Sequence, residues 1–85
     1  MQTVTPDVDL PSLRARIDEL DAELVRLIAE RTAVSEQIGR ARRAQGGPRI
    51  VHARENEVLQ RWREALGRPG AAIALSLLEL GRGRA

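Results

Sequence analysis

The sequence predicts an all-α fold of three helices, one long and two shorter, that form an intertwined helical homodimer. Two observations predict the helices: apolar residues recur every three or four positions from residue 13 to residue 38, and glycine–proline breakers divide the rest of the chain. A third observation predicts the dimer. The first helix would be about 50 Å long at 1.5 Å per residue, which exceeds the width of a compact domain of this size. Its apolar side therefore needs a second chain.

The length and composition of the chain allow one small domain, which we expect over residues 9–85 after a disordered segment at residues 1–8. The chain has 85 residues, no cysteine and one histidine, which excludes disulfides and argues against a zinc site. No apolar run reaches the roughly 20 residues that span a bilayer. The acidic, proline-containing N-terminus does not resemble a signal peptide. We therefore expect a cytoplasmic protein without a metal and without a membrane partner.

The first helix is expected to begin after Asp9, a candidate N-cap, with Pro11 in the first turn, where a missing N–H costs nothing. Gly39 does not end the helix, because the apolar spacing continues beyond it. The helix is expected to end near Ala44, since Gly46-Gly47-Pro48 is a strong breaker.

The two shorter helices follow. The second is expected from about His52 to Leu66, with Trp62 anchored in the core, and it is followed by breakers between Gly67 and Gly70. The third is expected from about Ala71 to Leu80 and is apolar nearly all round, which predicts that it is buried. Residues 81–85 are expected to form a basic, flexible tail.

Two arginines interrupt the apolar side of the first helix. Arg31 stands where the row of apolar side chains would continue after Leu24. At roughly 100° per residue, Arg42 projects within about 20° of the direction of Arg31. A guanidinium keeps its proton, and burying it unpaired is expensive. The two side chains therefore indicate either arginines at the rim of a helix–helix seam or a pocket that receives an anion.

Glu55 interrupts the apolar line of the second helix in the same way. It is interpreted either as a buried ion-pair partner of Arg31 or Arg42, or as a hydrogen-bond acceptor for a substrate hydroxyl. Arg14 lies about 100° around the first helix from Arg31, so it cannot line the same pocket. It is either a solvated first-turn arginine, the reading that the sequence alone favours, or a residue that completes the pocket of the partner in an antiparallel dimer.

Taken together, these residues describe a site with several fixed cations, one carboxylate and no nucleophile. Ser35 has no accompanying base, and His52 is interpreted as a capping or surface residue. Such a site suits a small dianion that carries a hydroxyl, and it favours a reaction that needs positioning and charge stabilisation. Arginines cluster in the middle of the chain, where they would attract phosphates or a carboxylated metabolite. They are Arg40, Arg42, Arg43, Arg49 and Arg54.

At this point the chain resembles a known family, the all-helical chorismate mutases, and in particular their compact intracellular (delta-type) subclass. The resemblance covers about residues 9–84, and the order and spacing of its segments make it specific. The segments that carry it are Leu13-Arg14, residues 17–21, Arg31, residues 38–42, residues 46–55 and residues 80–84.

The resemblance implies an enzyme of phenylalanine and tyrosine biosynthesis that converts chorismate to prephenate by a Claisen rearrangement, without a cofactor. It implies that Arg31 and Arg54, with Arg14 from the other protomer, hold the two substrate carboxylates. It further implies that Arg42 donates to the ether oxygen, where negative charge grows in the transition state. Glu55 would accept from the ring hydroxyl, and Val51 would shape the loop side of the pocket.

The chain departs from the family in two places. Many members have lysine at the position of Arg42, and many carry a glutamine or glutamate on the last helix that reaches the ether oxygen. Here that helix offers only Ser76 and Glu79. In the subclass the C-terminal segment docks on a DAHP synthase, and the corresponding residues here would be Gly81, Arg82, Gly83 and Arg84.

Two alternatives stay open. The same arginine clamp would serve a mutase acting on 4-amino-4-deoxychorismate or a pyruvate lyase acting on isochorismate. A non-catalytic dimeric helical module is the other reading, and it predicts that the middle arginines face solvent. The short Gly-Arg run is weak evidence for nucleic acid, so no nucleic-acid partner is expected.

Overall fold

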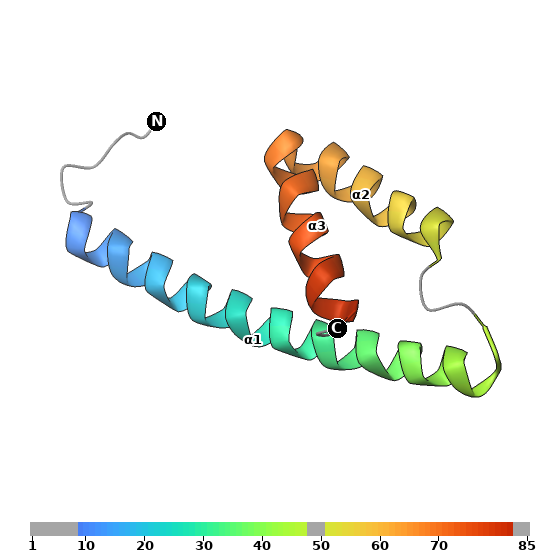
Figure 1. Ribbon diagram of the computed structural model, residues 1–85. Coiled ribbons are helices and arrows are strands. Elements are labelled where there is room, and N and C mark those ends of the chain that lie inside the picture. The colour runs from blue at the N-terminus through green and yellow to red at the C-terminus, as the bar shows by residue number, and fades with distance from the viewer. Residues whose placement is uncertain (1–8, 48–50, 83–85) are drawn as a thin grey trace.

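The computed structural model describes residues 9–47 and 51–82, which form three helices (Figure 1). They are α1 (Leu10–Ala44), α2 (His52–Leu66) and α3 (Arg68–Arg82). The prediction of one long and two shorter helices is confirmed. The expected disorder of residues 1–8 and the last three residues of the expected tail fall outside the described residues. In the described part of the chain, no helix is long and apolar enough to cross a membrane.

The long helix α1 runs for 35 residues without a break at Gly39, as predicted. Asp9 occupies the N-cap position with an extended backbone, although its side chain makes no capping hydrogen bond. At the other end, Gly46 adopts a positive φ of 78°, and the Gly47 N–H donates to the Arg42 carbonyl oxygen at 2.8 Å. This left-handed residue closes the helix, which explains why a glycine pair stands there.

A single residue, Gly67 with φ 80°, separates α2 from α3. The predicted start of the third helix at Ala71 is wrong, because α3 begins at Arg68 and accepts Pro69 in its first turn. Gly70 is not a breaker but a buried packing residue, since a Cβ there would overlap the Trp62 carbonyl oxygen. The predicted end at Leu80 is also wrong, because the helix continues through residues 81 and 82.

The helix α3 packs on both α2 and α1, and it joins them into one body (Figure 1). The N-terminal half of α1 extends away from the other two helices. The described residues measure 60 × 23 × 20 Å, with a radius of gyration of 17.9 Å. A compact chain of this length would have a radius of about 12 Å, so the shape is that of a rod with a small cap.

Among the described residues, the buried apolar core is small and consists of Val58, Ala74 and Leu77. The prediction that the third helix is buried holds for Ala74 and Leu77 but is wrong for Leu75 and Leu80, which are 52% and 50% exposed. The reason is that, within the described residues, α3 packs on α1 and α2 alone, and these do not cover Leu75 and Leu80.

The apolar side of α1 is also exposed. No residue of this helix is buried, and Leu13 and Leu24 are 49% and 54% exposed. Apolar side chains repeated at helical spacing usually face a core, and the described part of this chain provides none for the first half of α1.

Candidate active site

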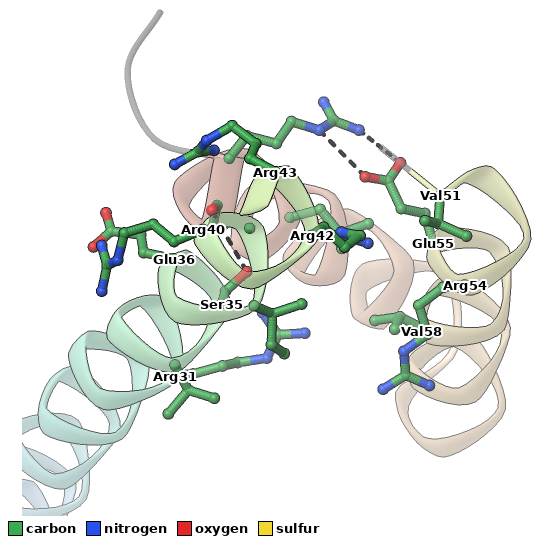
Figure 2. A pocket seen from close by; sticks show the side chains of 16 residues that line it. Arg31, Ser35, Glu36, Arg40, Arg42, Arg43, Val51, Arg54, Glu55 and Val58 are labelled. Carbon is green, nitrogen blue, oxygen red and sulfur yellow. Dashed lines mark hydrogen bonds and ion pairs between the residues drawn. The ribbon is translucent and has the colours of Figure 1, made fainter. Parts of the chain in front are cut away.

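A cavity of about 650 Å³ lies between the second half of α1, the start of α2 and the end of α3 (Figure 2). Its polar lining is dominated by arginine, and among the described residues it includes two carboxylates, both of glutamates. The electrostatic potential of such a hollow is positive, and it attracts anions. The arginines are Arg31, Arg40, Arg42, Arg43, Arg54 and Arg82.

Arg31 and Arg42 come from α1 and are both half-buried beside the cavity (Figure 2). Among the described residues, neither guanidinium has a carboxylate within ion-pair distance. The Nε atom of Arg42 is buried, and in the described part of the chain it has no hydrogen-bond partner. A buried donor on a charged group costs free energy until it is satisfied, so an acceptor oxygen that reached this Nε would be bound favourably.

Arg54 lies on the α2 side of the cavity and is more exposed. Its Nη1 donates to Oε1 of Glu57 at 3.2 Å, one turn away, and its side chain is 58% exposed. An exposed pair of this kind contributes about 0–1 kcal/mol, so the guanidinium can exchange Glu57 for another carboxylate at little cost.

Glu55 makes a two-point contact with Arg82 from the end of α3. The Arg82 Nη2 donates to Oε1 at 2.6 Å and its Nε donates to Oε2 at 3.2 Å, and the Glu55 side chain is only 18% exposed. The interpretation of Glu55 as an ion-pair partner of Arg31 or Arg42 is therefore wrong. The reason lies in α3, which runs two residues further than predicted and brings Arg82 to the cavity.

The remaining walls are apolar or small. Val51 is the N-cap residue of α2, is half-buried and lines the cavity. Ser35 also lines it and donates from Oγ to the Gly81 carbonyl oxygen at 3.5 Å. This contact joins α1 to α3, so Ser35 helps to build the site instead of reacting in it.

Arg14 is the one predicted substrate-binding residue that does not line the cavity. It lies 17 residues before Arg31 on the same helix, a separation of about 25 Å. Arg82 is the residue whose place in the cavity was missed, because its sequence neighbours Gly81 and Gly83 suggested a flexible tail. Among the described residues, no group of three or more histidine, cysteine, aspartate or glutamate side chains could hold a metal ion.

A long helix, two short helices and a hollow lined by arginines define an all-helical protein with a cavity that attracts anions. Residues 13–75 match the type II chorismate mutase family. This chain therefore belongs to the type II chorismate mutases, which isomerise chorismate to prephenate.

Similar proteins agree with the match. The chain is 48% identical over 83 residues to the intracellular chorismate mutase of Mycolicibacterium smegmatis, covering 98% of this chain and 80% of that protein. It is 51% identical over 79 residues to the intracellular chorismate mutase of Mycobacterium tuberculosis, and the match covers 93% of this chain and 72% of that protein.

A solved structure has the same fold. It is a chain from the non-covalent complex of DAHP synthase and chorismate mutase from Corynebacterium glutamicum, solved with a bound transition state analogue. The TM-score is 0.85 at 38% identity, and the match covers 89% of this chain and 92% of the other. The predicted all-α fold and the predicted activity are thus confirmed.

Proposed function

We propose that the arginine-lined cavity is the place where this chain rearranges chorismate. In this intramolecular reaction the ether C–O bond breaks while a C–C bond forms, and no proton has to be transferred to the protein. The site then needs groups that hold the substrate in a reactive conformation and stabilise charge on the departing oxygen. The chain supplies fixed cations from α1 and α2 around the hollow, and a carboxylate from α2.

The observation that carries the proposal is the unsatisfied Nε of Arg42. In our scheme this guanidinium donates to the ether oxygen. Because negative charge grows on that oxygen as the bond breaks, the hydrogen bond strengthens in the transition state and raises kcat. A half-buried cation without a carboxylate partner among the described residues is suited to this role, since no internal anion competes with the ligand.

Arg31 and Arg54 lie on opposite sides of the hollow and would bind the substrate carboxylates. A guanidinium binds a carboxylate through two parallel N–H groups, which fixes its orientation as well as its position. Within the described residues, Arg31 makes no ion pair that the substrate would have to break, and Arg54 makes only its exposed ion pair with Glu57. Both are therefore available to an incoming dianion.

Glu55 would accept a hydrogen bond from the ring hydroxyl, and Val51 would shape the hollow beside it. The Glu55 carboxylate lies at the edge of the cavity and is mostly buried, so a hydrogen bond formed there is shielded from water. Figure 2 shows both residues at the start of α2, across the hollow from α1.

The active form, in this proposal, is a homodimer in which Arg14 of one protomer completes the site of the other. The exposed apolar side of α1 supports a second copy of the chain as its cover, because two such seams bury each other. The distance of about 25 Å between Arg14 and the cavity along α1 excludes a contribution within one chain. In an antiparallel pair, the start of one α1 reaches the middle of its mate.

The proposed partner outside the dimer is a DAHP synthase, and the proposed location is the cytoplasm. The C. glutamicum relative is described in complex with that synthase, and the mycobacterial relatives are described as intracellular. We assign docking to the C-terminal residues Gly81, Arg82, Gly83 and Arg84. The last two lie outside the described residues.

The proposal is tested by mixing the purified chain with chorismate and following the loss of its ultraviolet absorbance, with and without a DAHP synthase. We expect turnover in both cases and a higher rate with the synthase if the docking assignment holds. Arg31→Ala should raise KM, because the clamp acts on the bound substrate. Turnover with an unchanged KM in this variant would remove Arg31 from the clamp.

A further inference from the structure

We infer that Arg82 is a positioning and specificity residue for the ring hydroxyl, and that it acts through Glu55. The inference rests on the proposed function, in which Glu55 accepts from that hydroxyl. It assigns to Arg82 a role that its place within the proposed docking segment did not suggest. It also specifies how the site would distinguish a hydroxyl from an ammonium group at the same ring position.

The geometry fixes the Glu55 carboxylate on both of its oxygens. Arg82 donates from Nη2 to one oxygen at 2.6 Å and from Nε to the other at 3.2 Å. A glutamate side chain has several rotatable bonds, and a two-point contact with a planar guanidinium removes most of that freedom. Each carboxylate oxygen keeps a second lone pair, so Glu55 can still accept from a ligand.

Charge gives the pair a second effect. Glu55 and Arg82 together are neutral, and the Glu55 side chain is only 18% exposed. A hydroxyl needs only an acceptor, and it finds one. An ammonium group would be attracted to an unpaired carboxylate. Here it would also approach the guanidinium of Arg82, which carries the same charge and repels it. Arg82 therefore acts as a repulsive element against cationic analogues.

The inference predicts which kinetic constant changes. The hydroxyl is not on the breaking bond, so its hydrogen bond has similar strength in the ground state and in the transition state. Loss of the positioning contact should raise KM for chorismate several-fold and leave kcat within about twofold. A general loosening of the end of α3 would instead lower the amount of folded protein and reduce kcat.

The experiment compares Arg82→Gln, which keeps the side-chain stem without its charge, with Arg82→Lys, which keeps the charge without the planar fork. For each variant, kcat and KM are measured with chorismate, and the inhibition constant is measured for the 4-amino analogue as a competitor. Arg61→Gln is the matched control, since Arg61 is an exposed arginine of α2 away from the cavity. Circular dichroism checks the helix content of every variant.

We expect Arg82→Gln to shift the preference for hydroxyl over ammonium by about tenfold toward the amino analogue. Arg82→Lys should retain most of the preference, and Arg61→Gln should not alter it. The same comparison in a Glu55→Gln background should show almost no further effect, because the two residues act as one unit. Additive effects in that background would overturn the inference.

The remaining outcomes separate the inference from the function on which it rests. If Glu55→Ala, which removes the acceptor, leaves both kcat and KM unchanged, the proposed hydroxyl contact is wrong and the role of Arg82 fails with it. If Glu55→Ala raises KM but Arg82→Gln changes neither KM nor the preference, the proposed function stands and only the inference is contradicted.

Discussion

The Oγ of Ser35 donates to the carbonyl oxygen of Gly81 at 3.5 Å, although 46 residues separate the two along the chain. This is a point at which α3 meets α1, and it lies at the edge of the cavity. A Cβ on residue 81 would overlap the Ser35 Oγ, so the close approach of the two helices requires glycine there.

The first prediction follows from this contact. Gly81→Ala should push the end of α3 away from α1 and lower kcat/KM for chorismate by about tenfold, because a shift of about 1 Å is enough to disturb a catalytic geometry. The double variant Ser35→Ala with Gly81→Ala removes the overlapping oxygen and should recover part of the loss. Wild-type kinetics in the single variant would show that the contact does not hold the site.

The second prediction concerns stability. Gly70→Ala should lower the free energy of unfolding by about 1–3 kcal/mol, because its Cβ would overlap the backbone of Trp62, which cannot move aside cheaply. The measurement is urea denaturation followed by circular dichroism.

Gly39→Ala is the matched control for this prediction. It places the same methyl group in a helix, where its nearest neighbour is the flexible end of Arg43 at 3.6 Å. This control should stabilise the protein by about 0.5–1 kcal/mol, since alanine favours helix over glycine. Equal effects of the two substitutions would contradict the packing role of Gly70.

The third prediction concerns Arg42. Arg42→Ala should lower kcat by at least about two orders of magnitude with the helix content intact, because one lost donor at a developing oxyanion costs roughly 3–4 kcal/mol. Arg26→Ala removes an arginine of the same helix that does not line the cavity, and it should have little effect on kcat. Near-normal turnover in Arg42→Ala would exclude this residue from the mechanism.

The fourth prediction concerns the exposed seam of α1. Leu24→Glu should convert the dimer to a monomer in sedimentation velocity and abolish activity, because it places a charge among apolar side chains that must pack together. Ala22→Glu makes the same change in charge about 200° around the helix, at roughly 100° per residue, and should leave the dimer intact. A monomeric wild-type protein with full activity would contradict the shared site.

The positions of the helices were largely predictable from the sequence, because they depend on local signals. The apolar spacing of α1 and the breaker at Gly46-Gly47 were enough to place Leu10–Ala44 within one residue of the expected helix. Gly70 and Gly81 were predicted to lie outside helices, whereas both lie inside α3 at points of close packing. The sequence around a glycine does not show whether it allows close packing inside a helix or breaks the helix.

The lining of the cavity was partly predictable from the sequence, but the pairings of its residues were not. Arg31, Arg42 and Glu55 attracted attention because each interrupts an apolar line, and all three line one cavity. The partner of Glu55 could not be read from the sequence, since it depends on how far α3 extends and where its end meets α1 and α2. The function of Arg14 depends on a second chain, so it stays a prediction.

The shared site is tested most directly by mixing two inactive variants, Arg14→Ala and Arg42→Ala. In a mixed dimer, one site receives both defects and the other receives neither, so one intact site appears per mixed dimer. At equal amounts and random exchange of subunits, about half of the dimers are mixed, and activity should rise to about one quarter of the wild-type value. Activity that stays at the average of the two parents would contradict the account, because it would mean that Arg14 does not act across the dimer.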